Sequence, residues 1–228
     1  MSGNAEAPRC RILVMASGNG SNFEALIEGV NSGRIANSEI IRLIVNRGKA
    51  YAIQRAANHG IPSENFNLVT HKFQAKGEKD PQKLQEARDK YDAALAEKIL
   101  GLEVRPHLIV LAGWMHILSP GFLKPLAEAG ILLINLHPAL PGMYDGAEAL
   151  ERAYADFEAG KLKDNKTGIM VHYVIEEVDR GAPILVKEIE CREGEELEQF
   201  KERVHSHEHQ LIVDATAKVA GEIVAKGL

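Results

Sequence analysis

The chain has 228 residues, of which 45% are hydrophobic and 26% are charged, and its formal net charge is -5 at pH 7. This composition excludes collagen-like, mucin-like and wholly disordered chains. The mild acidity argues against a nucleic-acid-binding protein that works by bulk positive charge. Two cysteines, Cys10 and Cys191, are too few for a secretory disulfide framework.

The N-terminal segment does not resemble a targeting signal. Residues 1–9 are small and polar, without the apolar core of a signal peptide. No apolar run reaches the roughly 18–20 residues that a membrane span requires. We therefore expect a soluble, cytoplasmic protein with a loose N-terminal end over about residues 1–9.

Short apolar runs predict buried strands, and the stretches between them carry apolar residues at helical spacing. Strands are expected at 12–16, 40–45, 65–69, 108–112 and 131–136, and helices at 22–31, 50–58 and from Pro81 to about Ile99. Asn22 or Ser21 is expected to cap the first helix, and the polar residues 70–83 to form a surface loop. Strands that alternate with helices predict an α/β domain with a doubly wound, mostly parallel sheet and helices on both faces.

The C-terminal third follows a different pattern. Strand-like runs at 168–175 and 184–190 are joined by the short segment 176–181, which predicts an antiparallel excursion at the sheet edge. A long helix is expected from about 195 to 225. The chain has no internal repeat, low-complexity segment or clear linker, so a single domain over residues 1–228 is expected.

A glycine-rich turn, Ser17–Asn22, lies between the first strand and the first helix. Its glycines let the backbone approach a ligand, and the following helix points unpaired N–H groups at it. The dinucleotide fingerprint would need a small residue where Phe23 stands, and the Gly-Lys-Ser/Thr of a P-loop is absent. The turn therefore predicts a cradle for a single phosphate, with a plain tight turn as the alternative.

Polar side chains end the strand at 131–136. Asn135 and His137 share one face by strand alternation, and an amide beside an imidazole can bind a carbonyl oxygen and supply a proton. Asp179, in the 176–181 loop, is a candidate carboxylate partner for an imidazole. Taken alone, His137 also fits a structural hydrogen bond, and Asp179 fits a solvated acidic turn.

The C-terminal helix carries a carboxylate on its apolar stripe. Glu208 lies four residues after Val204 and three before Leu211, so it needs a cationic or hydrogen-bonding partner, either a ligand or another side chain. His205 and His209 share a helix face, but no carboxylate or cysteine completes a recognisable metal-ligand set. We expect no metal site.

Several segments, in chain order, resemble motifs of the phosphoribosylglycinamide formyltransferase family. They are Ala16–Asn22, Leu111–Leu118, Asn135–Gly142, Val171–Val174 with Glu177–Asp179, and Arg203–His205 with Glu208–His209. The resemblance spans about residues 11 to 215, and its details are similar to the monofunctional fungal type.

The resemblance implies a formyltransferase-type fold and a reaction. A formyl group would move from 10-formyltetrahydrofolate, the co-substrate, to the primary amine of N1-(5-phosphoribosyl)glycinamide in purine biosynthesis. No metal would be needed. The partners would be these small molecules, with no nucleic acid and no membrane, and the protein would be a monomer or a homodimer.

The resemblance also implies residue roles. Asn135 would bind the formyl oxygen, His137 would protonate or stabilise that oxygen, and Asp179 would hold His137 and an ordered water. The ribonucleotide would contact Gly18, Asn19, Gly20, Ser21, Asn22 and Glu208. The folate would contact Arg88, Met115, His116, Ile117, Leu118 and Asn135.

The chain departs from the family pattern in three places. The loop 141–149 is shorter than in many relatives and has no histidine, and 71–83 resembles an insertion. Trp114 stands where bacterial relatives usually carry a smaller aromatic residue, so the folate pocket is expected to differ in shape. The resemblance leaves open whether the Leu140–Pro141 bond is cis.

Other functions stay open at this point. Methionyl-tRNA formyltransferases and formyltetrahydrofolate hydrolases resemble the chain around Asn135 and His137, but are expected to carry an extra domain and to lack the Gly18–Asn22 cradle. A nucleotide-binding module without catalysis would bind a ribonucleotide and show no folate-dependent turnover. The failed dinucleotide fingerprint argues against a nicotinamide oxidoreductase.

Overall fold

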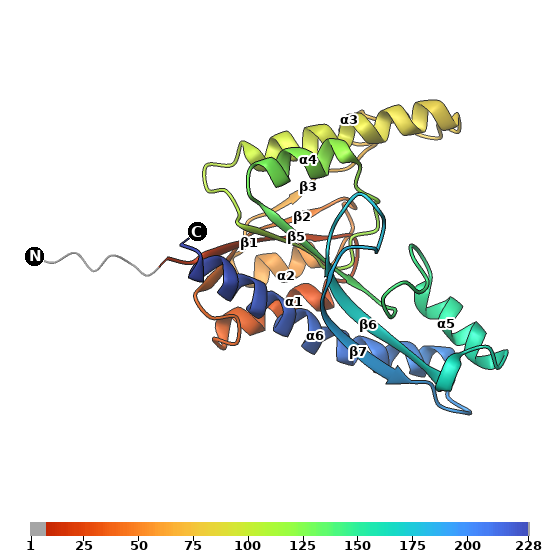
Figure 1. Cartoon of the computed structure of the whole chain (residues 1–228). Helices are drawn as coiled ribbons and strands as arrows, with labels where there is room; N and C mark the ends of the chain where they lie inside the picture. Colours follow the sequence, from red (N-terminus) through yellow and green to blue (C-terminus); the bar gives the residue numbers. More distant parts are fainter. Residues whose placement is uncertain (1–7, 228) are drawn as a thin grey trace, which may run out of the picture.

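A seven-stranded sheet with the order β3-β2-β1-β4-β5-β6-β7 runs through the computed structural model, which describes residues 8–227 (Figure 1). Its strands are β1 (Cys10–Ala16), β2 (Ser38–Val45), β3 (Ser63–Asn65), β4 (Leu108–Leu111), β5 (Leu132–His137), β6 (Lys166–Tyr173) and β7 (Pro183–Glu190). The first five strands in this order pair in parallel. β6 and β7 pair antiparallel at one edge, which confirms the predicted fold class. Most of the predicted loose end, residues 1–7, lies outside the described residues.

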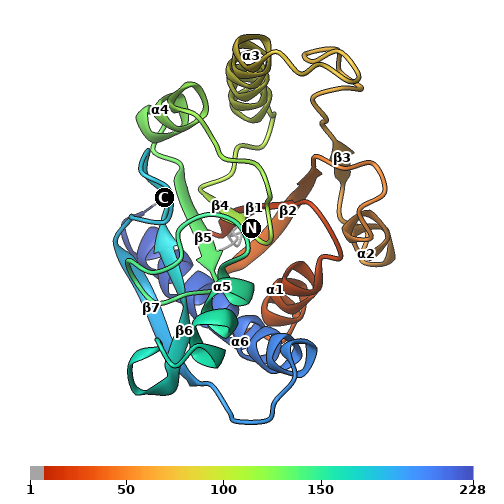
Figure 2. The same cartoon turned by 90° about the vertical axis from the view of Figure 1, so that its right-hand side faces the viewer.

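Helices cover both faces of the sheet (Figures 1 and 2). Alternate strand residues enter the two cores, so Val14 packs with α1 and α6 while Met15 packs with α3 and α4. Two further helices, α2 and α5, also contribute to the core that contains Val14. The helices are α1 (Ser21–Asn31), α2 (Ala52–Asn58), α3 (Pro81–Leu100), α4 (Pro120–Glu128), α5 (Ala149–Glu158) and α6 (Leu197–Ala225).

The sequence analysis missed the two helices α4 and α5. Pro120 and Pro125 made a helix here look unfavourable in the sequence, because a proline in a helix interior removes a backbone hydrogen bond. The helix forms nevertheless, since Phe122, Leu123 and Leu126 are buried on one of its faces.

Two local predictions were wrong. β3 covers 63–65 rather than 65–69, because the Asn67 side chain accepts hydrogen bonds from the N–H groups of Val69 and Thr70 and turns the chain. The start of α1 is not capped by Ser21 or Asn22. Both residues lie inside the helix, Gly20 occupies the N-cap position and no side chain caps it.

The strand order reverses direction at β1, which lies between β2 and β4. In doubly wound sheets, ligands bind beyond the carboxyl ends of the strands at such a point. The segments that follow β1, β4 and β5 meet there, and these are the segments in which the sequence analysis found the glycine-rich turn, Leu111–Leu118 and Asn135–Gly142.

Candidate active site

A cavity of about 740 Å³ lies beyond the carboxyl ends of β1, β4 and β5. This volume suits a small-molecule site. The segments around Gly18–Asn22, Leu111–Leu118 and Asn135–Pro138 form its walls, together with Val174–Asp179 and part of α6. All the site residues predicted from the sequence line this cavity except Arg88.

The carboxylate of Asp179 lies at the centre of a hydrogen-bonded group. Its Oδ2 is 3.4 Å from Nδ1 of His137 and accepts the N–H of Gly146 at 2.8 Å. Its Oδ1 is 3.3 Å from Nδ2 of Asn135 and 3.4 Å from Nε2 of His172. The structure therefore brings Asn135, His137 and Asp179 together, and the reading of Asp179 as a solvated turn residue is wrong, since its side chain is 9% exposed.

The surroundings of Asp179 favour its charged form. Burial by itself raises the pKa of this carboxyl group. The hydrogen bonds from His172 and from the Gly146 N–H, with the charges of His137 and His172, outweigh burial and lower the pKa below its usual value. Asp179 is therefore a carboxylate at neutral pH and can hold a neighbouring imidazole in one orientation.

The imidazole of His137 has an acceptor oxygen at each ring nitrogen. Nδ1 faces Asp179, and Nε2 lies 3.2 Å from the backbone oxygen of Met143. An imidazolium carries two N–H groups and can donate to both oxygens at once. His137 is almost fully buried, at 2% exposure, so its ring is held between these two partners.

His172 is a member of this group that the sequence analysis did not assign. It lies on β6 directly opposite Asn135 of β5, and its Nε2 is 3.3 Å from the Asn135 amide. Its Nδ1 is 2.8 Å from the backbone oxygen of Tyr173, so the ring is fixed at both nitrogens. Only the register of β6 against β5 places this histidine beside Asn135, and the sequence does not give that register.

Two loops hold Asp179 in place. Asp179 has a positive φ of 56°, which few non-glycine residues adopt. A Cβ at Gly181 would overlap the backbone oxygen of Tyr173, so only glycine lets the 176–181 loop pack this closely on β6. Arg180 pairs with Asp145 at 2.6 Å and ties this loop to the 141–149 loop. The Leu140–Pro141 bond before that loop is trans.

The glycine-rich turn is clamped from α2. Gly20 has a φ of 76°, and a Cβ there would lie 2.7 Å from the Cβ of Ala52. Arg55 donates to both the backbone and the side-chain oxygen of Asn19 at 3.0 Å, and to Glu24 of α1 at 3.1 Å. This clamp holds the turn open toward the cavity, and the sequence analysis did not find it.

Ser17 joins the turn to the next wall of the cavity. Its side-chain oxygen accepts the N–H of Met115 at 2.8 Å, and its own N–H donates to the oxygen of Gly113 at 3.0 Å. These two hydrogen bonds join the turn after β1 to the segment after β4.

Glu208 reaches the cavity from α6 and is 6% exposed. Burial raises the pKa of its carboxyl group, against the lowering effects of His205 and of a 3.4 Å hydrogen bond from Nδ2 of Asn22. The Asn22 Oδ1 atom is buried and has no hydrogen-bond partner. Asn22 and Glu208 thus leave polar groups free for a hydroxyl or amine of a ligand.

The segment after β4 presents apolar side chains at the cavity mouth. Met115 is 70% exposed and Ile117 is 67% exposed, whereas Leu118 is buried. His116 turns toward α3, where its Nε2 lies 2.7 Å from Oδ1 of the fully buried Asp92. Asp92 also accepts the N–H of Ser119 at 2.6 Å, so this carboxylate holds the segment at two points.

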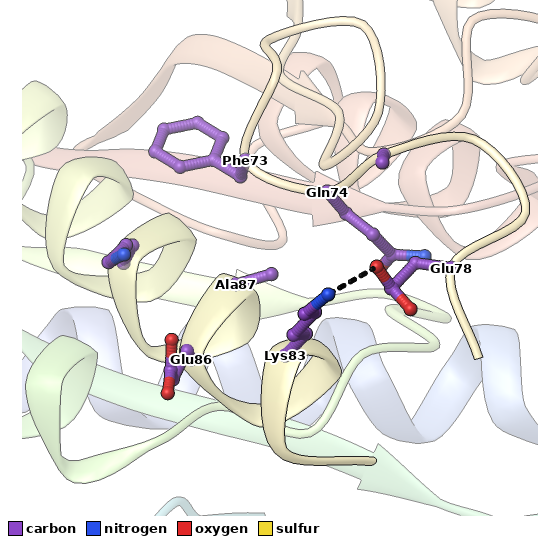
Figure 3. A pocket seen from close by; sticks show the side chains of 8 residues that line it. Phe73, Gln74, Glu78, Lys83, Glu86 and Ala87 are labelled. Carbon is purple, nitrogen blue, oxygen red and sulfur yellow. Dashed lines mark ion pairs between the residues drawn. The ribbon is translucent and has the colours of Figure 1, made fainter. Parts of the chain in front are cut away.

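Arg88 does not line the cavity. It is exposed on α3, where a smaller cavity of about 200 Å³ lies beneath the segment 73–78 (Figure 3). Lys83 Nζ and Glu78 Oε2 face each other across this smaller cavity at 4.0 Å. The two cavities share no lining residue, so the contact of Arg88 with a folate stays a prediction.

Within residues 8–227 there is no group of three or more His, Cys, Asp or Glu side chains that could hold a metal ion. His207 faces Lys187 at 3.0 Å rather than a second histidine. None of the helices in the described part of the chain is long and apolar enough to cross a membrane.

Comparison with known proteins supports the family that the sequence motifs resemble. A family model described as formyl transferase matches residues 10–216. A phosphoribosylglycinamide formyltransferase of Schizosaccharomyces pombe is 42% identical over 91% of this chain and 96% of that protein. The protein of the same name from Saccharomyces cerevisiae is 42% identical over 93% of this chain and 98% of that protein.

Solved structures agree with this assignment. The crystal structure of glycinamide ribonucleotide transformylase 1 from Symbiobacterium toebii superposes with a TM-score of 0.75 at 26% identity, covering 94% of this chain and 89% of that one. The family model covers the glycine-rich turn, the Asn135–Gly142 segment and α6 up to residue 216. The chain belongs to the formyl transferase family and, within it, to the phosphoribosylglycinamide formyltransferases.

Proposed function

We propose that this protein transfers the formyl group of 10-formyltetrahydrofolate to the amine of N1-(5-phosphoribosyl)glycinamide, a step of purine biosynthesis. The observation that carries the proposal is the convergence of Asn135 and His137 on the Asp179 carboxylate inside the large cavity. An amide and an imidazole can stabilise the negative oxygen of an acyl transfer, and a carboxylate can assist its proton transfers.

The cavity offers a separate place for each substrate. The N–H groups at the start of α1 and the Gly18–Asn22 turn suit the phosphate of the ribonucleotide. Glu208 and Asn22, at the same end, suit its hydroxyl or amine groups. The apolar wall formed by Met115, Ile117 and Leu118 suits the flat pteridine ring of the folate.

The polar group between these two places would carry out the transfer. The attacking amine produces a tetrahedral intermediate with a negative oxygen, which the amide of Asn135 and the imidazolium of His137 stabilise. One such donor is typically worth about 3–4 kcal/mol. The Asn135 amide donates to Oδ1 of Asp179 at 3.3 Å, so the formyl oxygen would take over this long hydrogen bond.

Asp179 would hold His137 and an ordered water. The amine must lose a proton and the folate nitrogen must gain one, and a water beside a carboxylate can pass the proton between them. This route forms no covalent bond to the protein.

We place the reaction in the cytoplasm, because Cys10 and Cys191 are free thiols. A monomer or a homodimer is expected.

The absorbance of released tetrahydrofolate, measured with and without the ribonucleotide, tests the proposal. We expect turnover that depends on both substrates. Turnover without the ribonucleotide would instead assign the chain to a hydrolase, and binding of the ribonucleotide without folate turnover would make it a nucleotide-binding module. Formyl transfer to methionyl-tRNA instead of the ribonucleotide would identify the chain as a methionyl-tRNA formyltransferase.

A further inference from the structure

The charges that line the large cavity do not balance. Six carboxylate side chains line it, those of Glu148, Glu151, Glu176, Glu177, Asp179 and Glu208. Besides four histidines, two of which (His137 and His172) face Asp179, the cavity wall within residues 8–227 contains one arginine, Arg47, and no lysine. A phosphate monoester carries nearly two negative charges, so the six carboxylates oppose its binding and a permanent cation beside it would offset them.

Arg47 lies where that cation is needed. It follows β2, and the last residue of β2, Val45, pairs with Ala16 of β1, so Arg47 lies beside the glycine-rich turn that follows β1. The N–H of Ala50 donates to the Arg47 oxygen at 3.0 Å and begins the turn into α2. The N–H of Ala52 then donates to Gly18 at 3.3 Å, which packs the two turns together.

The guanidinium of Arg47 is exposed and makes no hydrogen bond or ion pair within the described part of the chain. The other arginines around the cavity are engaged. Arg55 holds Asn19 and Glu24, and Arg180 holds Asp145. Arg47 is thus available for a ligand, and its planar fork of N–H groups matches a phosphate better than an ammonium group does.

We propose that Arg47 binds the phosphate of the ribonucleotide and makes the enzyme select a phosphorylated acceptor over an unphosphorylated one. This inference rests on the proposed function. The backbone N–H groups of the turn supply hydrogen bonds, and Arg47 supplies the full positive charge that they lack. Arg47 makes no contact with the Asn135, His137 and Asp179 group, so its effect falls on binding rather than on the chemical step.

Steady-state kinetics of Arg47→Gln test the proposal. The KM for the ribonucleotide is expected to rise about 10- to 100-fold, as for loss of a charge-assisted hydrogen bond. The values of kcat and of KM for the folate should stay within about threefold of wild type. Arg47→Lys should give an intermediate KM, because it keeps the charge and loses the fork. Lys49→Gln, which removes an exposed cation outside the cavity lining, is the matched control.

A second measurement separates this inference from the proposed function. Calorimetric titration with ribose 5-phosphate is expected to show binding to wild type, and binding to Arg47→Gln that is weaker by a similar factor. Equal binding to both proteins, or an unchanged KM for the ribonucleotide, would overturn the role of Arg47. Weakened binding by the variant with no formyl transfer by wild type would support Arg47 and refute the proposed function.

Discussion

Nδ1 of His137 lies 3.4 Å from Oδ2 of Asp179, although one residue ends β5 and the other lies in the loop between β6 and β7. Two further contacts hold the pair. The Gly146 N–H fixes the carboxylate, and the Met143 oxygen faces the other nitrogen of the ring. The 141–149 loop therefore supports the reacting group directly, even though it has no histidine of its own.

Replacement of the Asp179 carboxylate should separate turnover from binding. In Asp179→Asn the amide cannot hold the imidazole as an anion does, so kcat is expected to fall by about 10²- to 10⁴-fold. Ribonucleotide binding should change little, because the glycine-rich turn is untouched. Turnover close to that of wild type would remove the role proposed for Asp179. Asp214→Asn, which breaks the exposed ion pair with Arg34, is the control.

Glu208→Gln should raise the stability of the protein and weaken its binding of the ribonucleotide. Burial raises the pKa of Glu208 above the value near 4.5 that it has when unfolded. The stability linked to its proton is therefore complete below about pH 4.5 and is lost as pH rises through the folded pKa. A glutamine does not titrate, so the Glu208→Gln protein does not lose this stability as pH rises.

We expect the Tm of Glu208→Gln to exceed that of wild type at pH 7 by more than at pH 4.5, while its KM for the ribonucleotide is higher. Thermal unfolding at both pH values measures this difference. Glu202→Gln, on the exposed side of α6, should show neither effect. A Tm difference that does not change with pH would contradict the argument.

Asp92→Asn should act on the folate side alone. Asp92 is fully buried and holds His116 and the Ser119 N–H, so the change is expected to cost about 1–3 kcal/mol of stability. The KM for the folate should rise, because Met115–Leu118 loses its anchor, and the KM for the ribonucleotide should not. Chemical denaturation and kinetics with each substrate varied in turn check both parts. An equal rise in both KM values would argue for general loosening.

Arg55→Ala should loosen the glycine-rich turn without removing its N–H groups. Two hydrogen bonds to Asn19 are lost, each typically worth about 0.5–1.5 kcal/mol. We expect the KM for the ribonucleotide to rise about 3- to 30-fold at unchanged KM for the folate. Arg34→Ala, which breaks the exposed ion pair between Arg34 and Asp214, should leave both KM values unchanged. An equal rise of the ribonucleotide KM in Arg34→Ala would contradict the role given to the Arg55 hydrogen bonds.

The sequence by itself determined the sheet and most of its helices. Continuous apolar runs such as Ile12–Ala16 can only be buried on both faces, and a parallel sheet under two helical layers is the structure that does so. Its motifs also identified the family, because the glycine-rich turn, the Asn135–Gly142 segment and the Glu208 helix occur in one order. Glu208 was recognised as unusual because helical spacing alone places a carboxylate among apolar residues.

Only the tertiary structure decided which groups meet. Asp179, His172 and Gly146 come from three segments, and no local pattern marks the positive φ of Asp179 or the close packing of Gly181 on β6. Arg47, Arg55 and Asp92 look like ordinary surface or helix charges in the sequence, since the partner or the cavity that each faces lies far along the chain. Periodicity reports which face of an element is buried, whereas a site depends on distances between elements that are set when the whole sheet packs.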